Sequence, residues 1–476
     1  MHKTAIIGLD GAGWQHIRQC AKQWNLKFLN KIIQKGATGP MKSTIPPGSC
    51  PAWASFGTGK NPGKIGVFSF LDKKPKSYDM QLNYDVLNHL YCFWDALGDA
   101  GQTVMLLNMP LYGKKHVMSG DFIAGDFLPK IVYYPEELAK ELELDKKMMF
   151  AEWPNGVKYE QIIKDCFKML DDRLDVADKI FKKEWDVFIL VLQLDTLEHF
   201  SWDKPENIRK YLERVDQWLE QHISDDINLI ILGDHGSGEL KGDFLINNWL
   251  ANKNYLVFKK NPKQAKVLNK DRIEIILSKL GLVKFVMKIV PKRIIQMWPA
   301  KSLSFEKIKN QIDWSKTKAF ACGDAYTGSV YINKKGREPE GIVNEKEYSL
   351  LIKEIIQELK KTKGPNGEKL DFDIHIPSTT YSGKYAENAP DIIFIINNLE
   401  YTTKFAYKPG NELFVSTRKK ADHRPFGMLA AIGPDVKAGE IKNAEIIDIA
   451  PTILKHYKMP IDQEVDGKAL DLFKIS

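Results

Sequence analysis

The chain has few cysteines for its length, and they show no paired spacing. Its 476 residues include five: Cys20, Cys50, Cys92, Cys166 and Cys322. An odd number without a CxxC pair argues against a disulfide framework and against a thiolate zinc site. We therefore expect a reducing, cytoplasmic localisation, with peripheral contact to a membrane as the alternative.

Long apolar runs are also missing. The longest stay under about ten residues, whereas a membrane-spanning helix needs about 20. The N-terminus enters a strand-like pattern, TAIIGL, without the basic and apolar regions of a signal peptide. There is no internal repeat and no low-complexity segment. With 43% hydrophobic and 27% charged residues, the composition is typical of a globular protein.

What the chain does have is a series of short apolar runs separated by helix-length amphipathic stretches. Runs that are apolar on both faces and alternate with helical patterns favour a mostly parallel sheet covered by helices. Two clear helix candidates are 159–183 and 205–222. The strand candidates are 4–9, 103–109, 186–194, 227–233, 329–333, 391–397 and 428–433.

One basic segment interrupts this alternation. Residues 251–310 contain 15 Lys/Arg and 3 Asp/Glu, a local charge of +12, so the rest of the chain is at −4 within a total of +8. We predict an inserted, mainly helical cap at 251–318 between two parts of a catalytic core, 1–250 and 319–476. The cap has three interpretations: a solvated face, a guide for a polyanionic substrate, or contact of 271–296 with an anionic membrane. No nucleic acid is expected, because no aromatic stacking pattern accompanies the charge.

Acidic and histidine residues stand in four short motifs, three of which follow the carboxyl ends of apolar runs, whereas the fourth, with His423, precedes one. Open α/β sheets build their sites at the carboxyl ends of strands. Three Asp and three His are enough to ligate two divalent ions, and such mixed ligation suits zinc best, with manganese as the alternative. The candidate ligands are Asp10, Asp195, His199, Asp234, His235 and His423.

A Ser/Thr-rich loop, residues 43–66, leads into a helix-like stretch. Helix N-termini bind anions through their free N–H groups. A hydroxyl at such a place can also act as a nucleophile beside a metal ion. Taken alone, the loop leaves six candidates open: Ser43, Thr44, Ser49, Cys50, Ser55 and Thr58.

These motifs together resemble the alkaline phosphatase superfamily, in its phosphodiesterase and nucleotide pyrophosphatase branch. The resemblance rests on Asp10, SCPAWASFGTGKNPGKIG, DTLEH, GDHG, HRPFG, DIAPTIL and DGKAL, which follow the family's order along nearly the whole chain. It implies a three-layer α/β/α fold and a covalent seryl-phosphate intermediate at Ser49. It also implies two metal sites: Asp10, Ser49, Asp234 and His235 for one ion, and Asp195, His199 and His423 for the other.

The surroundings of Ser49 bear on the substrate. No Arg or Lys follows it before Lys60, and Trp53 is a candidate to pack on a second substituent. Both features favour phosphodiesters or pyrophosphates, linked to a nucleotide, sugar or lipid. Phosphotransfer, phosphomonoester hydrolysis and a non-catalytic role at a membrane surface remain alternatives. Arg424 is a candidate for either phosphate contact or a surface salt bridge, and Asn247 and Asn248 are candidates for the pocket border.

Overall fold

The computed structural model describes residues 2–83, 86–112, 120–124, 131–151, 153, 157–259, 304–324 and 326–474. Among these residues, no helix combines the length and the apolar character needed to cross a bilayer. The stretch 271–296, for which membrane contact is one interpretation, lies outside the described residues.

The larger sheet has the first strand of the chain near its centre. Within the described residues it contains ten strands, in the order β20-β2-β19-β9-β1-β8-β5-β6-β7, with β21 paired to β2. Strands β5, β6, β8, β1 and β9 run parallel, whereas β19 and β7 are antiparallel to their neighbours. The strands are β1 (Thr4–Asp10), β2 (Ala37–Lys42), β5 (Val104–Leu107), β6 (Phe122–Ala124), β7 (Val132–Tyr134), β8 (Val187–Gln193), β9 (Asn228–Leu232), β19 (Phe426–Ile432), β20 (Gly439–Glu440) and β21 (Ala444–Glu445).

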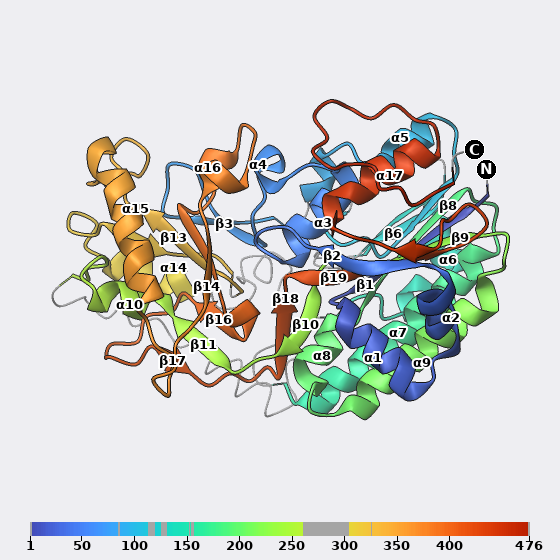
Figure 1. Ribbon diagram of the computed structural model, residues 1–476, viewed down its shortest axis with the longest axis horizontal. Helices are drawn as coiled ribbons and strands as arrows, with labels where there is room; N and C mark the ends of the chain where they lie inside the picture. Colours follow the sequence, from blue (N-terminus) through green and yellow to red (C-terminus); the bar gives the residue numbers. More distant parts are fainter. Residues whose placement is uncertain are drawn as a thin grey trace.

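Helices cover both faces of this sheet (Figure 1). Alternate residues of β1 enter separate cores, with Ile7 in one and Ile6 in the other, because successive side chains of a strand point to opposite faces. The first core lies under α1 (Trp14–Trp24), α2 (Lys27–Lys35), α6 (Leu138–Glu141), α7 (Tyr159–Phe181), α8 (Asp195–Ser201) and α9 (Pro205–His222). The second lies under α3 (Ser49–Thr58), α5 (Phe93–Asp99) and α17 (Ile449–His456). The predicted three-layer α/β/α arrangement is confirmed.

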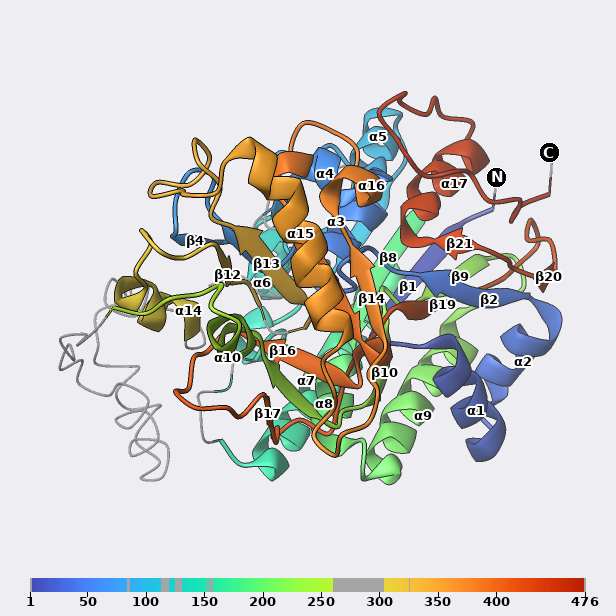
Figure 2. The same cartoon turned by 60° about the vertical axis from the view of Figure 1, so that its left-hand side comes forward.

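A second sheet forms a separate lobe beside the first. Its seven strands in the described residues follow the order β12-β13-β15-β16-β11-β17, with β14 paired to β15, and most neighbours are antiparallel. Figure 2 shows α15 lying across this sheet. The elements are β11 (Gly242–Leu245), β12 (Ala319–Ala321), β13 (Gly328–Ile332), β14 (Phe372–His375), β15 (Ile392–Ile396), β16 (Tyr401–Lys404), β17 (Phe414–Val415), α10 (Ile246–Asn252), α14 (Ser304–Ile308), α15 (Glu345–Lys360) and α16 (Pro377–Thr380).

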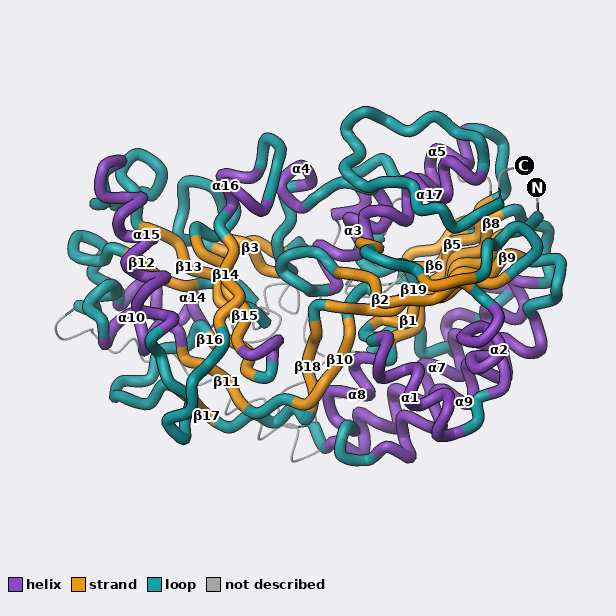
Figure 3. The backbone as a smooth tube through the Cα atoms, in the orientation of Figure 1, coloured by secondary structure: helices purple, strands orange, loops and turns teal. Residues whose placement is uncertain are grey.

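Short elements connect the two lobes. Strands β10 (Gly236–Glu239) and β18 (Ala421–Arg424) form an antiparallel ribbon, which runs between the two sheets in Figure 3. The register pairs Ser237 with His423. Strands β3 (Leu71–Lys73) and β4 (Met80–Leu82) form a small hairpin, and α4 (Pro62–Ile65) is a single turn.

The second lobe corrects one part of the sequence prediction. The strand candidates 329–333 and 391–397 were expected in one mostly parallel sheet, but they form β13 and β15 of the second sheet. Both strands are wholly buried, and an apolar pattern alone does not specify which sheet a strand joins. The division at 251–318 stays a prediction, since 260–303 is not described. The described flanks of that segment pack into the core of the second lobe, for example through Tyr255 and Phe305.

Candidate functional site

Three aspartates lie at the carboxyl edge of the larger sheet. Asp10 is the last residue of β1, Asp195 begins α8 just after β8, and Asp234 follows β9. Because β1 pairs in parallel with both β8 and β9, these three ends meet at one place. The sheet topology thus gathers residues that are far apart in sequence, as expected for an open α/β sheet.

Gly11 makes this close approach possible. Its φ is +83°, a conformation that L side chains rarely adopt, and a Cβ there would lie 2.6 Å from Cβ of Asp195. Its backbone N–H also donates to Oδ1 of Asp234 at 3.1 Å. One glycine therefore turns the chain after Asp10 and brings the other two carboxylates near.

Ser49 is the hydroxyl that the fold directs into this group. It is the first residue of α3 and is buried. Its Oγ lies 3.3 Å from Oδ1 of Asp10 and 3.2 Å from Nε2 of His235. Thr44 and Thr58 instead donate to the backbone carbonyls of nearby residues. The helix N-terminus directs its free N–H groups toward the same region.

Cys50, next to Ser49, faces away from the carboxylates. It is fully buried, and its Sγ contacts the carbonyl oxygen of Asn83 at 3.6 Å. Burial raises the pKa of the Cys50 thiol well above its usual value. A buried thiol of raised pKa is inert as a nucleophile, so Cys50 has a packing role.

The three histidines are oriented by backbone carbonyls. In each case Nδ1 lies 3.0 Å from a carbonyl oxygen, and Nε2 is directed toward the aspartates or the neighbouring histidines. Because a carbonyl partner holds Nδ1, Nε2 is the ring nitrogen that would bind a metal ion. The pairs are His199 with Ala421, His235 with Gly236, and His423 with Pro47.

The ligand atoms form two groups with one shared member. Asp195, His199 and His423 lie within 4.8 Å of one another, and so do Asp10, Asp195 and His235. The resemblance assigned Asp195 to the second ion alone, but its carboxylate lies within reach of both groups. Oδ2 of Asp234 is 3.4 Å from Nε2 of His235, so Asp234 borders the first group.

The electrostatics of the site fit bound cations. Burial, followed by the charge of Asp10, raises the pKa of Asp195 well above its usual range and that of Asp234 to about 7. Burial lowers the pKa of His235, but Asp234 and Asp10 outweigh it and raise the value to about 10. Oδ2 of Asp234 is buried without a hydrogen-bond donor. Clustered, desolvated carboxylates of this kind are stabilised by divalent cations.

Trp53 corrects the sequence interpretation. It was expected to pack on a substrate substituent, but its side chain is fully buried. Its indole N–H donates to Oδ2 of Asp10 at 3.1 Å, and its ring covers Gly8 of β1. Trp53 therefore orients the candidate metal ligand Asp10. Its position near Ser49 in the sequence does not indicate which substrate is bound.

The side chains of three further candidates are hydrogen-bonded to backbone carbonyls. Arg424 donates to the carbonyl oxygens of Leu399, His423 and Glu239, so it is neither a phosphate contact nor a surface salt bridge. Asn247 and Asn248 are buried and bind backbone carbonyls in the second lobe, rather than bordering a pocket at the site. In each case the buried backbone of a loop takes up the polar side chain.

Three residues near His423 were missed by the sequence interpretation. The Tyr326 ring stacks on the imidazole of His423 at 4.0 Å, and Oδ1 of Asp422 lies 3.8 Å from His423 Nε2. Nζ of Lys419 is 2.8 Å from the other oxygen of Asp422. The run of cations TRKK, directly before ADHR, was the available signal.

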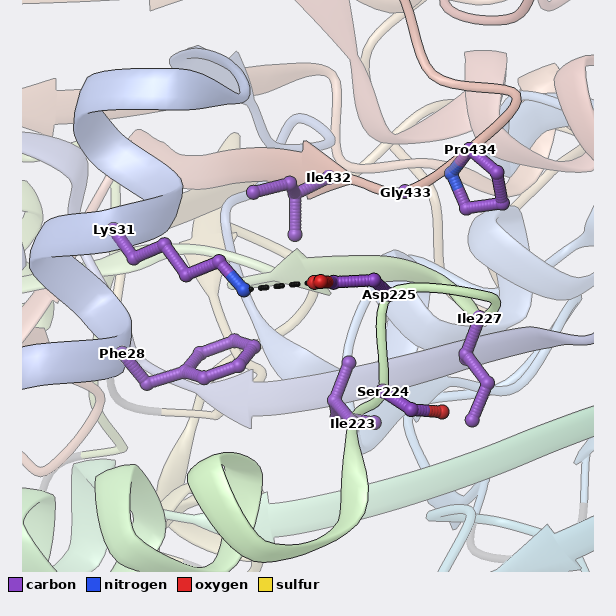
Figure 4. Close-up of a pocket in the computed structure, with 9 residues that line it drawn as sticks. All are labelled: Phe28, Lys31, Ile223, Ser224, Asp225, Ile227, Ile432, Gly433 and Pro434. Atoms are coloured by element: carbon purple, nitrogen blue, oxygen red, sulfur yellow. Dashed lines mark hydrogen bonds and ion pairs between the residues drawn. The ribbon is translucent and has the colours of Figure 1, made fainter.

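A cavity of about 220 Å³ lies at the opposite edge of the sheet, before β9 and after β19 (Figure 4). Lys31 and Asp225 form an ion pair across it at 3.1 Å. Apolar side chains supply most of its remaining lining, including Phe28, Ile223, Ile227 and Ile432. It shares no residue with the aspartate and histidine groups, so it is unrelated to their chemistry.

Comparisons with known proteins agree with this picture. The family model described as type I phosphodiesterase / nucleotide pyrophosphatase matches residues 4–425. No curated protein sequence matches the chain. Murine ectonucleotide pyrophosphatase / phosphodiesterase 5 has a similar fold, with a TM-score of 0.52, 10% identity, and coverage of 97% of this chain and 96% of that one. Phosphonoacetate hydrolase from Sinorhizobium meliloti 1021, in complex with phosphonoformate, has a TM-score of 0.58, 12% identity and 94% coverage of each chain.

Proposed function

The chain belongs to the type I phosphodiesterase / nucleotide pyrophosphatase family and is an enzyme of that type, and from that premise we propose that it cleaves phosphodiesters or pyrophosphates through a seryl-phosphate intermediate at Ser49. The observation that carries the proposal is the position of the Ser49 Oγ, 3.3 Å from Asp10 and 3.2 Å from His235. The substrate would be a nucleotide-, sugar- or lipid-linked phosphoester.

Two divalent cations complete the proposed site, zinc best and manganese as the alternative. Asp10, Asp234, His235 and Ser49 would hold one, and Asp195, His199 and His423 the other. The bound cations would supply positive charge that favours ionised Ser49 and offsets charge developing on the phosphoryl oxygens.

The side chains of the protein supply the geometry of the reaction. Oδ1 of Asp10 is placed to accept the hydroxyl proton of Ser49 as its Oγ attacks phosphorus. The Oγ–P bond forms as the bond to the leaving oxygen breaks, and water then attacks the seryl phosphate and releases Ser49. The N–H groups at the start of α3 would donate to the phosphoryl oxygens, although Pro51 contributes no N–H.

Two alternatives use the same side chains. A substrate hydroxyl in place of water would give a phosphotransferase, and a terminal phosphate would make the enzyme a phosphomonoesterase. Because structures of a nucleotide pyrophosphatase and of a phosphonate hydrolase share the fold, a substrate panel should contain diesters, monoesters, nucleotide sugars and phosphonates. We also propose a cytoplasmic setting, supported by five cysteines that all lie buried. Cell fractionation tests it, and recovery in a secreted fraction would contradict it.

The test of the function is hydrolysis of bis(4-nitrophenyl) phosphate by the purified protein loaded with zinc. We expect activity that is lost with a chelator and restored by zinc. Ser49→Ala should lower kcat by at least about a thousandfold, the scale of a lost nucleophile. The matched control is Ser55→Ala, which removes a buried hydroxyl without a partner from the same helix and should leave kcat unchanged. Hydrolysis of equal rate in the Ser49→Ala protein would exclude the covalent route.

A further inference from the structure

Four side chains form a column that leads out from the metal ligands. The imidazole of His235 stacks on that of His423 at 3.7 Å, and His423 stacks on Tyr326 at 4.0 Å. Nζ of Lys419 lies over the outer part of the column, 5.6 Å from the centre of the Tyr326 ring. The column thus ends in an ammonium group beside the Asp195, His199 and His423 set.

Asp422 fixes the position of that ammonium group. Its carboxylate is buried, with Oδ2 2.8 Å from Lys419 Nζ and Oδ1 3.8 Å from His423 Nε2. Only one carboxylate therefore separates Lys419 from the nitrogen of His423 that faces the candidate metal position. The Lys419 side chain remains 28% exposed, so part of its ammonium group is open to a ligand.

The ring of Tyr326 also lies near the proposed nucleophile. It lies in the loop between β12 and β13, and a Cβ built on Gly48 would come within 3.7 Å of its ring. Gly48 directly precedes Ser49. The ring therefore spans the distance from the start of α3 to Lys419, and an anion bound at Ser49 would have the ring and the ammonium group on one side.

The two neighbouring cations point elsewhere. The guanidinium of Arg418 lies over the ring of Tyr159 at 5.3 Å, and Nζ of Lys420 pairs with Asp203 at 3.2 Å. Of the three successive basic side chains, that of Lys419 is the one directed toward the site, where it contacts Asp422 and Tyr326; Lys420 contacts His199 only through its backbone N–H. Lys419 therefore brings a cation close to the site, although no Arg or Lys lies close after Ser49 in the sequence.

We propose that Lys419, held by Asp422 and backed by Tyr326, binds a second anionic group of the substrate and so favours pyrophosphates over singly charged diesters. The inference rests on the proposed function and adds a positioning residue to it. A charged donor next to a divalent cation is suited to a second phosphate, because the two anionic groups of a pyrophosphate are joined through one oxygen. A singly charged diester has no second anionic group for Lys419 to bind.

A purely structural role makes a different prediction. If Lys419 only neutralises the buried carboxylate of Asp422, its loss disturbs His423 and lowers the turnover of every substrate alike. The discriminating quantity is therefore the ratio of two substrates within each variant, not the activity on one of them.

The experiment compares diadenosine diphosphate with bis(4-nitrophenyl) phosphate in the zinc-loaded protein. Lys419→Ala should lower kcat/KM for the diphosphate about tenfold, mostly through KM, which is the loss expected for one charge-assisted hydrogen bond. The value for the singly charged diester should change less than about twofold. Lys419→Arg should restore most of the preference, and the control Lys420→Ala should leave both values unchanged. An equal fall for both substrates, or no fall, would overturn the proposal.

A binding measurement separates this inference from the proposed function. Calorimetry on the zinc-loaded Ser49→Ala protein, which does not depend on turnover, should show ADP binding more tightly than AMP. The added Lys419→Ala change should remove that preference. If AMP and ADP bind equally before the change, or keep their difference after it, the role of Lys419 is refuted even if the enzyme hydrolyses diesters. If the preference behaves as expected but no substrate is cleaved, the hydrolase proposal fails and the anion site stands.

Discussion

The pKa values of carboxyls are shifted in opposite directions at the two edges of the larger sheet. At the edge before β9, Asp435 is bonded by Asn228 and His2 at 2.9 Å each. Partial burial raises its pKa, but these hydrogen bonds outweigh it and hold the value below the usual range. At the carboxyl edge, burial and the neighbouring Asp10 raise the pKa of Asp195 instead.

This difference in pKa distinguishes the candidate functional site from a structural carboxyl. A structural carboxylate such as Asp435 receives donors from its surroundings, so its ionised form is stabilised. Asp195 and Asp234 also accept backbone N–H groups, from Thr196 and Gly11, but burial and the neighbouring Asp10 outweigh these bonds and raise the pKa of both carboxyls. Buried acids of raised pKa that gather in one place are typical of active sites. Changing one acid at each edge tests this comparison directly.

The largest expected effect is that of Asp195→Asn. The amide keeps the shape of the side chain but removes the charge that lies within reach of both ligand groups. We expect kcat/KM to fall by about a thousandfold or more, since bound metal supplies several kcal/mol of transition-state stabilisation. Metal content by atomic emission should fall too. Asp435→Asn at the opposite edge is the control, and it should leave metal content and activity intact; equal effects of the two changes would remove the distinction between the edges.

A smaller effect is expected from Trp53→Phe. The change keeps a buried ring in α3 but removes the indole N–H that donates to Asp10. Partners that orient metal ligands typically contribute about 10–100-fold to metal affinity. Zinc affinity, measured by competition with a chromogenic chelator, should fall by about tenfold. The control is Trp249→Phe, which removes an equivalent indole bond to Thr362 in the second lobe; a similar loss of affinity there would show that general stability is responsible.

The smallest effect concerns the stability of the metal-free protein. The pKa of Asp234 is about 7 in the folded state and 3.8 ordinarily. A folded-state value above the unfolded one means that the folded chain holds more protons between these limits. Stability is therefore fully present below pH 4 and is lost as the pH rises through 7.

Melting curves in a chelator check this sign. Between pH 5 and 7 the Tm should fall by roughly 1–2 °C per pH unit from this group. Asp234→Asn should flatten the slope in part, leaving the share of Asp195. A melting temperature that rises with pH in the wild type and not in the variant would contradict the raised pKa.

The sequence predicted which side chains share the carboxyl edge, but not how they are divided. Strand ends and the rule for open α/β sheets were enough to gather Asp10, Asp195 and Asp234. The shared position of Asp195 depends on the turn at Gly11, which no periodicity reveals. Membership of β13 and β15 in a second sheet depends on long-range pairing, which two equally apolar runs do not specify.

The direction in which individual side chains point could also not be predicted from the sequence. Trp53 follows Ser49 by four residues, one helical turn, and that spacing is compatible with facing either the substrate or the sheet. The close approach of Gly8 decides the matter, because the missing side chain opens the space that the indole fills. Similarly, TRKK shows three cations in a row, but only tertiary contacts select Lys419 among them.

The ribbon of β10 and β18 has a consequence for the order in which the site is assembled during synthesis. It joins the segment after GDHG to a strand made nearly two hundred residues later, and that strand carries His423. During synthesis, five of the six Asp and His ligands emerge early, while the sixth arrives only after the entire second lobe. A nascent chain or an N-terminal fragment thus lacks one histidine of the second ion group. Binding of the proposed second ion would therefore require a chain in which both lobes are complete.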